Sequence, residues 1–454
     1  MGLKKNLFAD LLATDVVPEI EALLGRQAVE ELDLEALELA VRQQVLRLAG
    51  AAIEQRLSAD TTDERGSRTG CGCGQEARLV GRRSKRVHSV LGLLRLERAY
   101  YYCSWCGHGF CPRDQHLRIE NTSLSPALTR MTGTVGALVS FQEGSALLTE
   151  LAGVAVDAKQ VERTAEALGQ EISQDERGYA EPSDTLALPQ TLYLGMDGTG
   201  IPLRAEELAG RAGKQPDGSA KTGEVKLCTI WSAESLDAEG TPIRDEGSVT
   251  YSAALESASA LDTAAARSPF AERVWREATR RRFCQVSRTA VLGDGAAWIW
   301  NIAEDQFPKA IQIVDRYHAK QHLSDLGKAL YGPTSPPAAQ WAERRKEELD
   351  TGEFRALLHA IRRQVSRSED ARRCLRYFQT NRHRMRYPEF HAQGLCTSTG
   401  VVEAGCKVAI GTRLKRAGMH WTIHGANAII ALRCSKLSGR FQDFWERRSE
   451  RRAA

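Results

Sequence analysis

Two stretches decide the fold of this 454-residue chain: TLYLGMDGTG at residues 191–200 and RTAVLGDGAAW at residues 288–298. Each is a short apolar run that ends in an aspartate followed by glycine, Asp197 in the first and Asp294 in the second. Short apolar runs bounded by turn residues are typical of buried strands. Because short loops connect the strands and helices of this region, we expect an α/β fold. Its remaining strands are expected at 223–234, at 247–255 and just before Asp315.

The two aspartates predict a metal site. In open α/β sheets the functional side chains gather at the carboxyl ends of strands, and two neighbouring carboxylates repel unless a cation lies between them. Mg²⁺ prefers such oxygen ligands. We expect Glu403 as the third ligand, because an acid among the apolar residues 401–404 needs a partner. Two-ion carboxylate sites drive in-line displacement at phosphorus. The alternative is that each strand-end aspartate is a turn residue, with Asp294 capping a helix at 296–304.

Five motifs together carry a family resemblance. The chain resembles bacterial insertion-sequence transposases of the DDE type, specifically the ISKra-like group, which is related to Mutator-like transposases. The resemblance spans residues 70–440, and the last motif is the most specific. The motifs are YLGMDGTG (193–200), GEVKL (223–227), VLGDGAAWIWN (291–301), DRYHAKQHL (315–323) and STGVVEAGCKVAIGTRLKRAGMHW (398–421).

This resemblance implies an RNase-H-like catalytic core at 190–318 and 396–440, interrupted by a helical insertion at 319–395. It implies that Asp197, Asp294 and Glu403 are the catalytic acids and hold two Mg²⁺ ions, with Mn²⁺ as a substitute. Related groups carry an Asp/His pair like Asp315 and His318, which makes these two residues auxiliary candidates. An imidazole near a helix start is also a common structural hydrogen-bonding group, and we keep that reading for His318.

Two cysteine pairs predict a zinc site. Cys71-x-Cys73 and Cys103-x₂-Cys106 flank a segment rich in β-branched and alternating residues, with a turn expected near 91–92. Four thiolates can close a tetrahedral structural Zn²⁺ site, so we expect a zinc ribbon at 71–111. Unliganded buried cysteines are the alternative. His108 and Cys111 are substitute ligands.

Helices are expected on both sides of this ribbon. Residues 1–60 predict an N-terminal helical arm, followed by a linker at 59–70. Residues 124–180 predict a helix-turn-helix-like domain, in which Gly153 breaks the chain and Asp157 caps the second helix. Two short helices joined by a glycine-containing turn also occur in α domains that do not bind DNA.

The charge distribution predicts DNA as the partner. Residues 61–120 have a net charge of +5 and residues 371–454 have a net charge of +12, whereas residues 1–60 have −5. Basic blocks of this kind favour a polyanion, although basic residues also solvate helices. Trp421 is also a candidate for core packing. The candidate DNA-binding residues are Lys407, Arg413, Lys415, Arg416 and Trp421, with Arg382, Arg384, Arg386 and His420 nearby.

The resemblance implies the function of an insertion-sequence transposase. It would bind the terminal inverted repeats of its element and catalyse Mg²⁺-dependent strand cleavage and strand transfer, at least as a dimer when two ends are joined. No apolar run reaches the ~18 residues of a membrane span, and Asp10 and Asp15 interrupt a secretory segment. We therefore expect a cytoplasmic, nucleoid-associated protein. The alternatives are a DNA-binding protein that no longer transposes and an RNase-H-like nuclease.

Overall fold

The structure is a computed structural model. It describes residues 33–178 and 188–451, apart from 214, 239, 259–261 and 264, together with the isolated residues 18 and 22. The chain divides into two compact units, residues 1–165 with 443–454 and residues 166–442. The first helix expected in the N-terminal arm lies outside the described residues. No helix in the described part of the chain is long and apolar enough to cross a membrane.

The first unit contains a four-stranded antiparallel sheet with the order β1-β2-β3-β4. The strands expected between the cysteine pairs are present, but they form one long hairpin, in which β2 pairs with β3 and the turn lies at Val90 and Leu91. A bulge interrupts the pairing between Leu79 and Gly81. The four strands are β1 (Arg68–Gly70), β2 (Glu76–Ser89), β3 (Gly92–Tyr102) and β4 (Gly109–Phe110).

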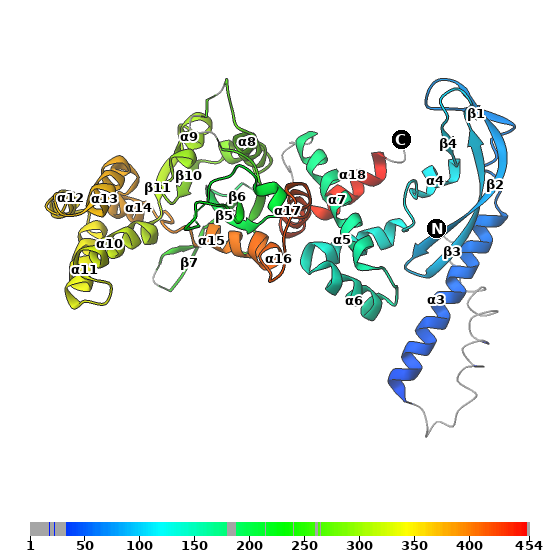
Figure 1. The fold of residues 1–454 in the computed structure, drawn as a ribbon, viewed down its shortest axis with the longest axis horizontal. Coiled ribbons are helices and arrows are strands. Elements are labelled where there is room, and N and C mark those ends of the chain that lie inside the picture. Colours follow the sequence, from blue (N-terminus) through cyan, green and yellow to red (C-terminus); the bar gives the residue numbers. More distant parts are fainter. Residues whose placement is uncertain are drawn as a thin grey trace. The chain divides into compact units, whose positions relative to one another are not determined.

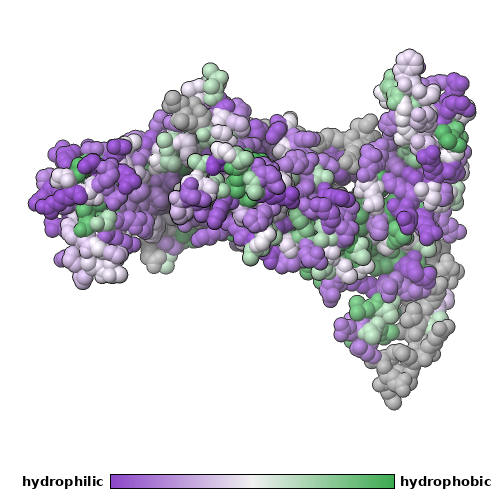
Figure 2. All heavy atoms as spheres, in the orientation of Figure 1, coloured by the Kyte–Doolittle hydropathy of each residue, from purple (hydrophilic) through white to green (hydrophobic). Residues whose placement is uncertain are grey.

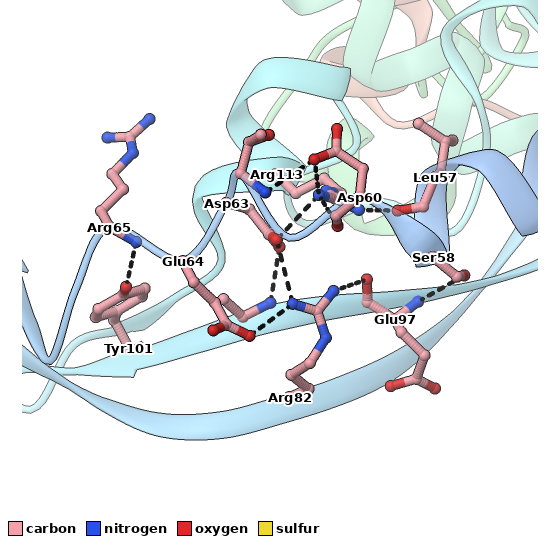
Figure 3. A network of polar contacts seen from close by, with 12 residues as sticks. Leu57, Ser58, Asp60, Asp63, Glu64, Arg65, Arg82, Glu97, Tyr101 and Arg113 are labelled. Atoms are coloured by element: carbon pink, nitrogen blue, oxygen red, sulfur yellow. Dashed lines mark hydrogen bonds and ion pairs between the residues drawn. The ribbon is translucent and has the colours of Figure 1, made fainter.

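The segment that connects helix α3 (Leu34–Ala59) to β1 lies where the sequence predicts a linker, at 59–70, and it is fixed to this sheet. Asp63 is buried and accepts hydrogen bonds from the backbone N–H of Ala99 (2.8 Å) and from the guanidinium of Arg113 (2.9 Å). Arg82 binds Asp63 and Glu64 from the opposite side (Figure 3). Because buried charges are stable only when paired, this network holds the end of α3 against the sheet.

Four helices follow the sheet in the first part of the chain, and a small apolar core joins three of them. Ser125 caps the first of these three, and Gly153 ends the second with φ +68°. Asp157 accepts a hydrogen bond from the backbone N–H of Gln160, as the sequence predicts for the residue that caps the third of these helices. The helices are α4 (Pro112–Leu117), α5 (Pro126–Leu138), α6 (Phe141–Ala152) and α7 (Ala158–Gly178), and α18 (Phe441–Arg451) ends the described chain.

The second unit is built on a mixed five-stranded sheet with the order β11-β10-β5-β6-β9. β5, β10 and β11 are parallel, β6 is antiparallel to β5, and β9 is antiparallel to β6. All five strands lie where the sequence predicts them. They are β5 (Thr191–Pro202), β6 (Thr222–Ser232), β9 (Thr250–Ala254), β10 (Arg288–Gly293) and β11 (Ile311–Val314), while β7 (Ser235–Leu236) and β8 (Pro242–Ile243) form a separate hairpin.

Helices cover both faces of this sheet (Figure 1). On one face, α8 (Pro269–Arg280) packs on β6 and β9, and its Arg273 reaches Ser252 of β9. On the other face, α15 (Gly400–Gly405) packs on β5 and β6. A π-helical segment at Cys406–Gly411 continues α15. The other helices around the sheet are η3 (Ala205–Leu208), η4 (Phe283–Gln285), α9 (Ala297–Gln306), α16 (Thr412–Leu414) and α17 (Ile423–Leu437).

Between β11 and α15 the chain is helical, as the sequence predicts for 319–395. α10 and α11 pack together, as do α12 and α13, and the surface over these helices is mainly hydrophilic in the view of Figure 2. The elements are α10 (Arg316–Tyr331), α11 (Pro336–Asp350), α12 (Phe354–Arg362), α13 (Glu369–Thr380), η5 (Arg382–Arg384) and α14 (Tyr387–Ala392).

Candidate functional site

The sheet and α15 bring Asp197 and Glu403 to one site. Alternate residues of a strand share a face, so Asp197 and Gly195 of β5 point to the same side. On that side an added Cβ at Gly195 would lie 2.1 Å from Cγ2 of Val402 in α15. This close approach needs a glycine, and it places Glu403, the next residue of α15, beside the end of β5.

The charges of Asp294 and Glu403 both reach Asp197. Burial raises the pKa of Asp197 above its ordinary value, and the charges of Asp294 and Glu403 raise it further. Two hydrogen bonds act in the opposite direction, from the backbone N–H of Gly198 (2.7 Å) and from the thiol of Cys406 (3.4 Å). A cation at this position would relieve the repulsion among the three carboxylates.

As placed in the structure, the three acids do not form a closed site around a single ion. Within the described residues, their oxygens do not form a group in which every ligand atom lies within 4.8 Å of the others. The side chain of Glu403 is exposed, so the apolar burial expected for this acid is wrong.

A tight turn holds Asp294 after β10. Its Oδ1 accepts from the backbone N–H of Ala296 (2.8 Å), and the intervening Gly295 has φ +104°. Ala296 is the N-cap of α9, so Asp294 stabilises the turn before the helix and does not occupy the cap position itself.

Tyr377 of α13 fixes this turn from the helical insertion. Its hydroxyl donates to the backbone carbonyl of Asp294 (2.9 Å), and its ring lies so close to Gly295 that an added Cβ would be 2.5 Å from Cε2. His322 packs on the same ring with the centroids 4.1 Å apart. Sequence reasoning missed Tyr377, because no spacing links a tyrosine in a helical insertion to a distant strand end.

Asp315 is a buried structural anchor. It caps α10 through the backbone N–H of His318, and its Oδ2 accepts from both the backbone N–H and the hydroxyl of Thr399, the N-cap of α15. Asp315 therefore positions the helix that carries Glu403. The ring of His318 lies edge-on to His322, 5.0 Å away. Burial lowers the pKa of His322, and the charge of His318 lowers it further.

Three of the expected DNA-binding side chains are exposed in the segment that follows Glu403. Lys407 lies in the π-helical segment, and Lys415 and Arg416 follow α16. The ammonium of Lys415 donates to the hydroxyl of Thr199, two residues beyond Asp197. Lysine and arginine near a carboxylate site allow a phosphate backbone to approach it.

Arg413 and Trp421 are buried, which contradicts the expectation that they contact DNA. Arg413 has no exposed surface, and its guanidinium lies 5.2 Å from the ring of Trp421. The indole N–H of Trp421 donates to the carbonyl of Leu414 (3.0 Å), and its backbone pairs with the strand residues around Leu203. Their role is to attach the segment after α16 to the sheet.

The arginines that precede Glu403 also differ from expectation. Arg384 is buried, binds Glu304 (2.7 Å) and packs over Trp300 at 4.5 Å. Arg382 packs over Phe354, and Arg386 pairs with Glu389. Arg384 is thus a structural residue of the insertion.

The four cysteines of the two pairs converge in the first unit. Cys71, Cys73, Cys103 and Cys106 have all sulfur atoms within 4.8 Å of one another, and the pairs Cys71–Cys106 and Cys73–Cys103 are 3.7 and 3.8 Å apart. A tetrahedral Zn²⁺ with Zn–S bonds of about 2.3 Å requires sulfur atoms about 3.8 Å apart. The cluster therefore fits a zinc ion. Cys111 and His108 are not members of it.

Two tight turns present these sulfur atoms. Gly74 and Gly107 have φ +82° and +72°, and their N–H groups donate to the carbonyls of Cys71 and Cys103. Backbone N–H groups of Cys106 and Trp105 point at the sulfur of Cys103 and lower the pKa of this thiol to about 7. The thiolate is the form that binds metal.

Comparison with known proteins gives few matches. Residues 275–450 match the sequence model of an uncharacterised protein family, UPF0236, which covers less than half of the chain. No curated protein matches. Among solved structures, the Drosophila P element transposase strand transfer complex is similar at 9% identity with a TM-score of 0.25, over 72% of this chain and 80% of that one. A score this low carries no argument about fold or function.

Proposed function

We propose that this chain is a DDE-type DNA transposase of an insertion sequence, with Asp197, Asp294 and Glu403 as its catalytic acids. The observation that carries the proposal is the packing of α15 on β5, where Gly195 meets Val402 on the face that carries Asp197. The charges of Asp294 and Glu403, which come from two other elements, also raise the pKa of Asp197. The motifs around the three acids are those of the resemblance to the ISKra-like group.

The sheet supports an RNase-H-like core. β5, β6 and β9 form an antiparallel meander, and β10 and β11 add parallel to β5 on its other side. This arrangement is the one expected of an RNase-H-like sheet. It puts Asp197 on the central strand and Asp294 at the end of its parallel neighbour.

The chemistry proposed for this site is phosphodiester cleavage followed by strand transfer. Mg²⁺ held by the three acids would activate water or a 3′-hydroxyl and stabilise the leaving oxygen. The residues of the chain would bind and orient the DNA: Lys407, Lys415 and Arg416 are exposed in the segment after Glu403 and would contact phosphates. Asp315 and Tyr377 keep the α15 helix and the Asp294 turn in place.

The experiment is a cleavage assay on DNA that carries the inverted repeats flanking the reading frame in its genome, with Mg²⁺ and without it. Asp197→Asn, Asp294→Asn and Glu403→Gln are each expected to abolish cleavage while DNA binding stays within about twofold. Glu343→Gln, an exposed acid of α11, is the matched control and should cleave normally.

The outcome also separates the alternatives. Cleavage of unrelated DNA or RNA with no preference for the repeats would indicate a nuclease. Repeat-specific binding with no cleavage in Mg²⁺ or Mn²⁺ would indicate a DNA-binding protein that does not transpose. A Glu403→Gln variant that still cleaves would remove Glu403 from the ligand set. Two repeat ends bridged by the protein would support the dimer proposed for strand transfer.

A further inference from the structure

The zinc end of the ribbon exposes aromatic and cationic side chains that the proposed catalytic site does not use. Residues paired directly across antiparallel strands point to the same face, and the pairs Arg78↔Tyr102 and Arg83↔Arg98 place Arg78, Tyr102 and Arg83 on one face of β2 and β3. Tyr100 belongs to this face as well, because it lies two residues from Tyr102 on the same strand.

The same face changes character along the hairpin. Toward the loop at residues 90–91 it is buried, since Val87, Leu94 and Leu96 form a core with Ile119. Toward the cysteines it is open: Arg78 and Arg83 are exposed, and Tyr102 is 42% exposed. The side chains of the exposed part therefore do not pack in a hydrophobic core, unlike those near the loop.

The charge of this exposed part is positive. Arg83 stacks over the ring of Tyr100 at 3.5 Å from the centroid. Neither Arg78 nor Arg83 forms an ion pair with any acid in the described part of the chain. Arg68 pairs with Arg78 across β1 and β2, but its charge is offset by Glu76 at 3.1 Å.

A large aromatic ring stands at the same end. Trp105 lies in the turn between Cys103 and Cys106 and is 80% exposed, the most exposed of the large apolar side chains in the described residues. Exposed aromatic rings that accompany cations suit stacked bases beside a phosphate backbone. An apolar protein partner would not require the two arginines.

We propose that the zinc end of the ribbon, formed by Arg78, Arg83, Tyr102 and Trp105, binds DNA with unpaired bases. The arginines contact phosphates, and Trp105 and Tyr102 stack on bases. The zinc knuckle sets the position of Trp105. This inference deepens the proposed function, because the ligand is the DNA on which the acids are proposed to act, yet it does not require cleavage.

The test is fluorescence anisotropy with labelled single-stranded and duplex DNA, using the full chain that carries Asp197→Asn so that no strand is cut. No chelator is added, because it would also remove zinc. Trp105→Ala is expected to weaken single-strand binding about tenfold and duplex binding by less than about threefold, since stacking needs an unpaired base. Tyr102→Ala should have a smaller effect in the same direction.

The arginines have a matched control on the opposite face. Arg86 and Arg95 are exposed and paired with each other across the hairpin. The double variant Arg78→Glu/Arg83→Glu is expected to weaken DNA binding at least tenfold more than Arg86→Glu/Arg95→Glu, although both double variants change the net charge of the chain by the same amount. The slope of log affinity against log salt should fall by about 1.4, which corresponds to two phosphates of a single strand.

Two results would overturn the inference. Equal losses from the two arginine pairs would mean that only overall charge matters. A Trp105→Ala chain that keeps full single-strand affinity, or that changes its oligomeric state instead, would assign the surface to a second copy of the chain. Zinc content equal to the parent chain verifies that the variants keep their knuckles. A parent chain, with Asp197 intact, that binds single-stranded DNA through the ribbon but cleaves no DNA in Mg²⁺ would refute only the proposed function.

Discussion

Tyr377 connects the helical insertion to the proposed catalytic site, and Tyr377→Phe tests whether this contact serves the chemistry. The substitution removes one atom, the hydroxyl that donates to the carbonyl of Asp294 at 2.9 Å. The ring remains, with its packing against His322 at 4.1 Å and Phe378 at 5.4 Å. The perturbation is therefore confined to the hydrogen bond that holds the turn.

The expected magnitude follows from that single bond. A neutral hydrogen bond contributes about 1 kcal/mol, and a tenfold change in an equilibrium corresponds to about 1.4 kcal/mol. If the turn carries this energy, the equilibrium constant for correct placement of Asp294 falls about fivefold. We expect the Mg²⁺ concentration for half-maximal cleavage to rise by up to about fivefold, with the maximal rate within about twofold. The melting temperature should fall by about 2–4 °C.

The assay is cleavage rate against Mg²⁺ concentration, with Mg²⁺ binding by calorimetry as a readout that needs no DNA substrate. Tyr317→Phe is the matched control, because Tyr317 is 65% exposed on α10. A Tyr377→Phe chain that loses thermal stability but keeps the parent Mg²⁺ dependence would refute the reasoning, since Tyr377 would then stabilise the fold without positioning Asp294.

Three further predictions concern other parts of the chain. Asp315→Asn should lower the melting temperature by several degrees and reduce cleavage more than tenfold, because an amide cannot accept hydrogen bonds from both His318 and Thr399. Thermal unfolding and cleavage assays measure these effects, and Thr399→Val, which removes only one of the bonds, should have a smaller effect. Equal stability of Asp315→Asn and the parent would contradict the anchor role. The purified chain should contain one zinc per molecule, and Cys103→Ser should lose it by metal analysis; full zinc content in that variant would exclude the site. Burial, followed by the neighbouring carboxylates, raises the pKa of Asp197 above its value of 3.8 in the unfolded chain. The folded chain therefore binds more protons than the unfolded chain, and the free energy of unfolding falls as pH rises through the raised pKa. Asp197→Asn should melt at a higher temperature than the parent at pH 7 without Mg²⁺, and a lower melting temperature would show that the charge of this carboxylate does not destabilise the fold.

The local features of the fold could be predicted from sequence because they depend on neighbouring residues. The apolar runs that end in Asp197 and Asp294 form strands, and the two cysteine pairs form turns, since glycines next to them permit positive φ. The helical spacing of 319–395 produces helices for the same reason. These are short-range consequences of side-chain size, polarity and backbone freedom.

The side-chain environments could not be predicted in this way. Arg413 and Trp421 looked like a DNA contact because they are basic and aromatic, but they are buried together. Glu403 looked buried because its neighbours are apolar, but its helix turns it toward solvent. Exposure depends on what packs against each side of an element, and that is set by residues far along the chain.

The sequence by itself therefore determined the strands, the helical insertion, the cysteine pairs and the identity of the candidate acids. The tertiary structure alone decided that α15 lies on the same face as Asp197, that Asp315 secures it through Thr399, and that Tyr377 holds the Asp294 turn. The physical reason is the separation along the chain of the residues that interact. Hydrophobic periodicity and turn chemistry act between residues a few positions apart, whereas a shared electrostatic site requires elements far apart in the sequence to pack at contact distance, as Gly195 and Val402 do.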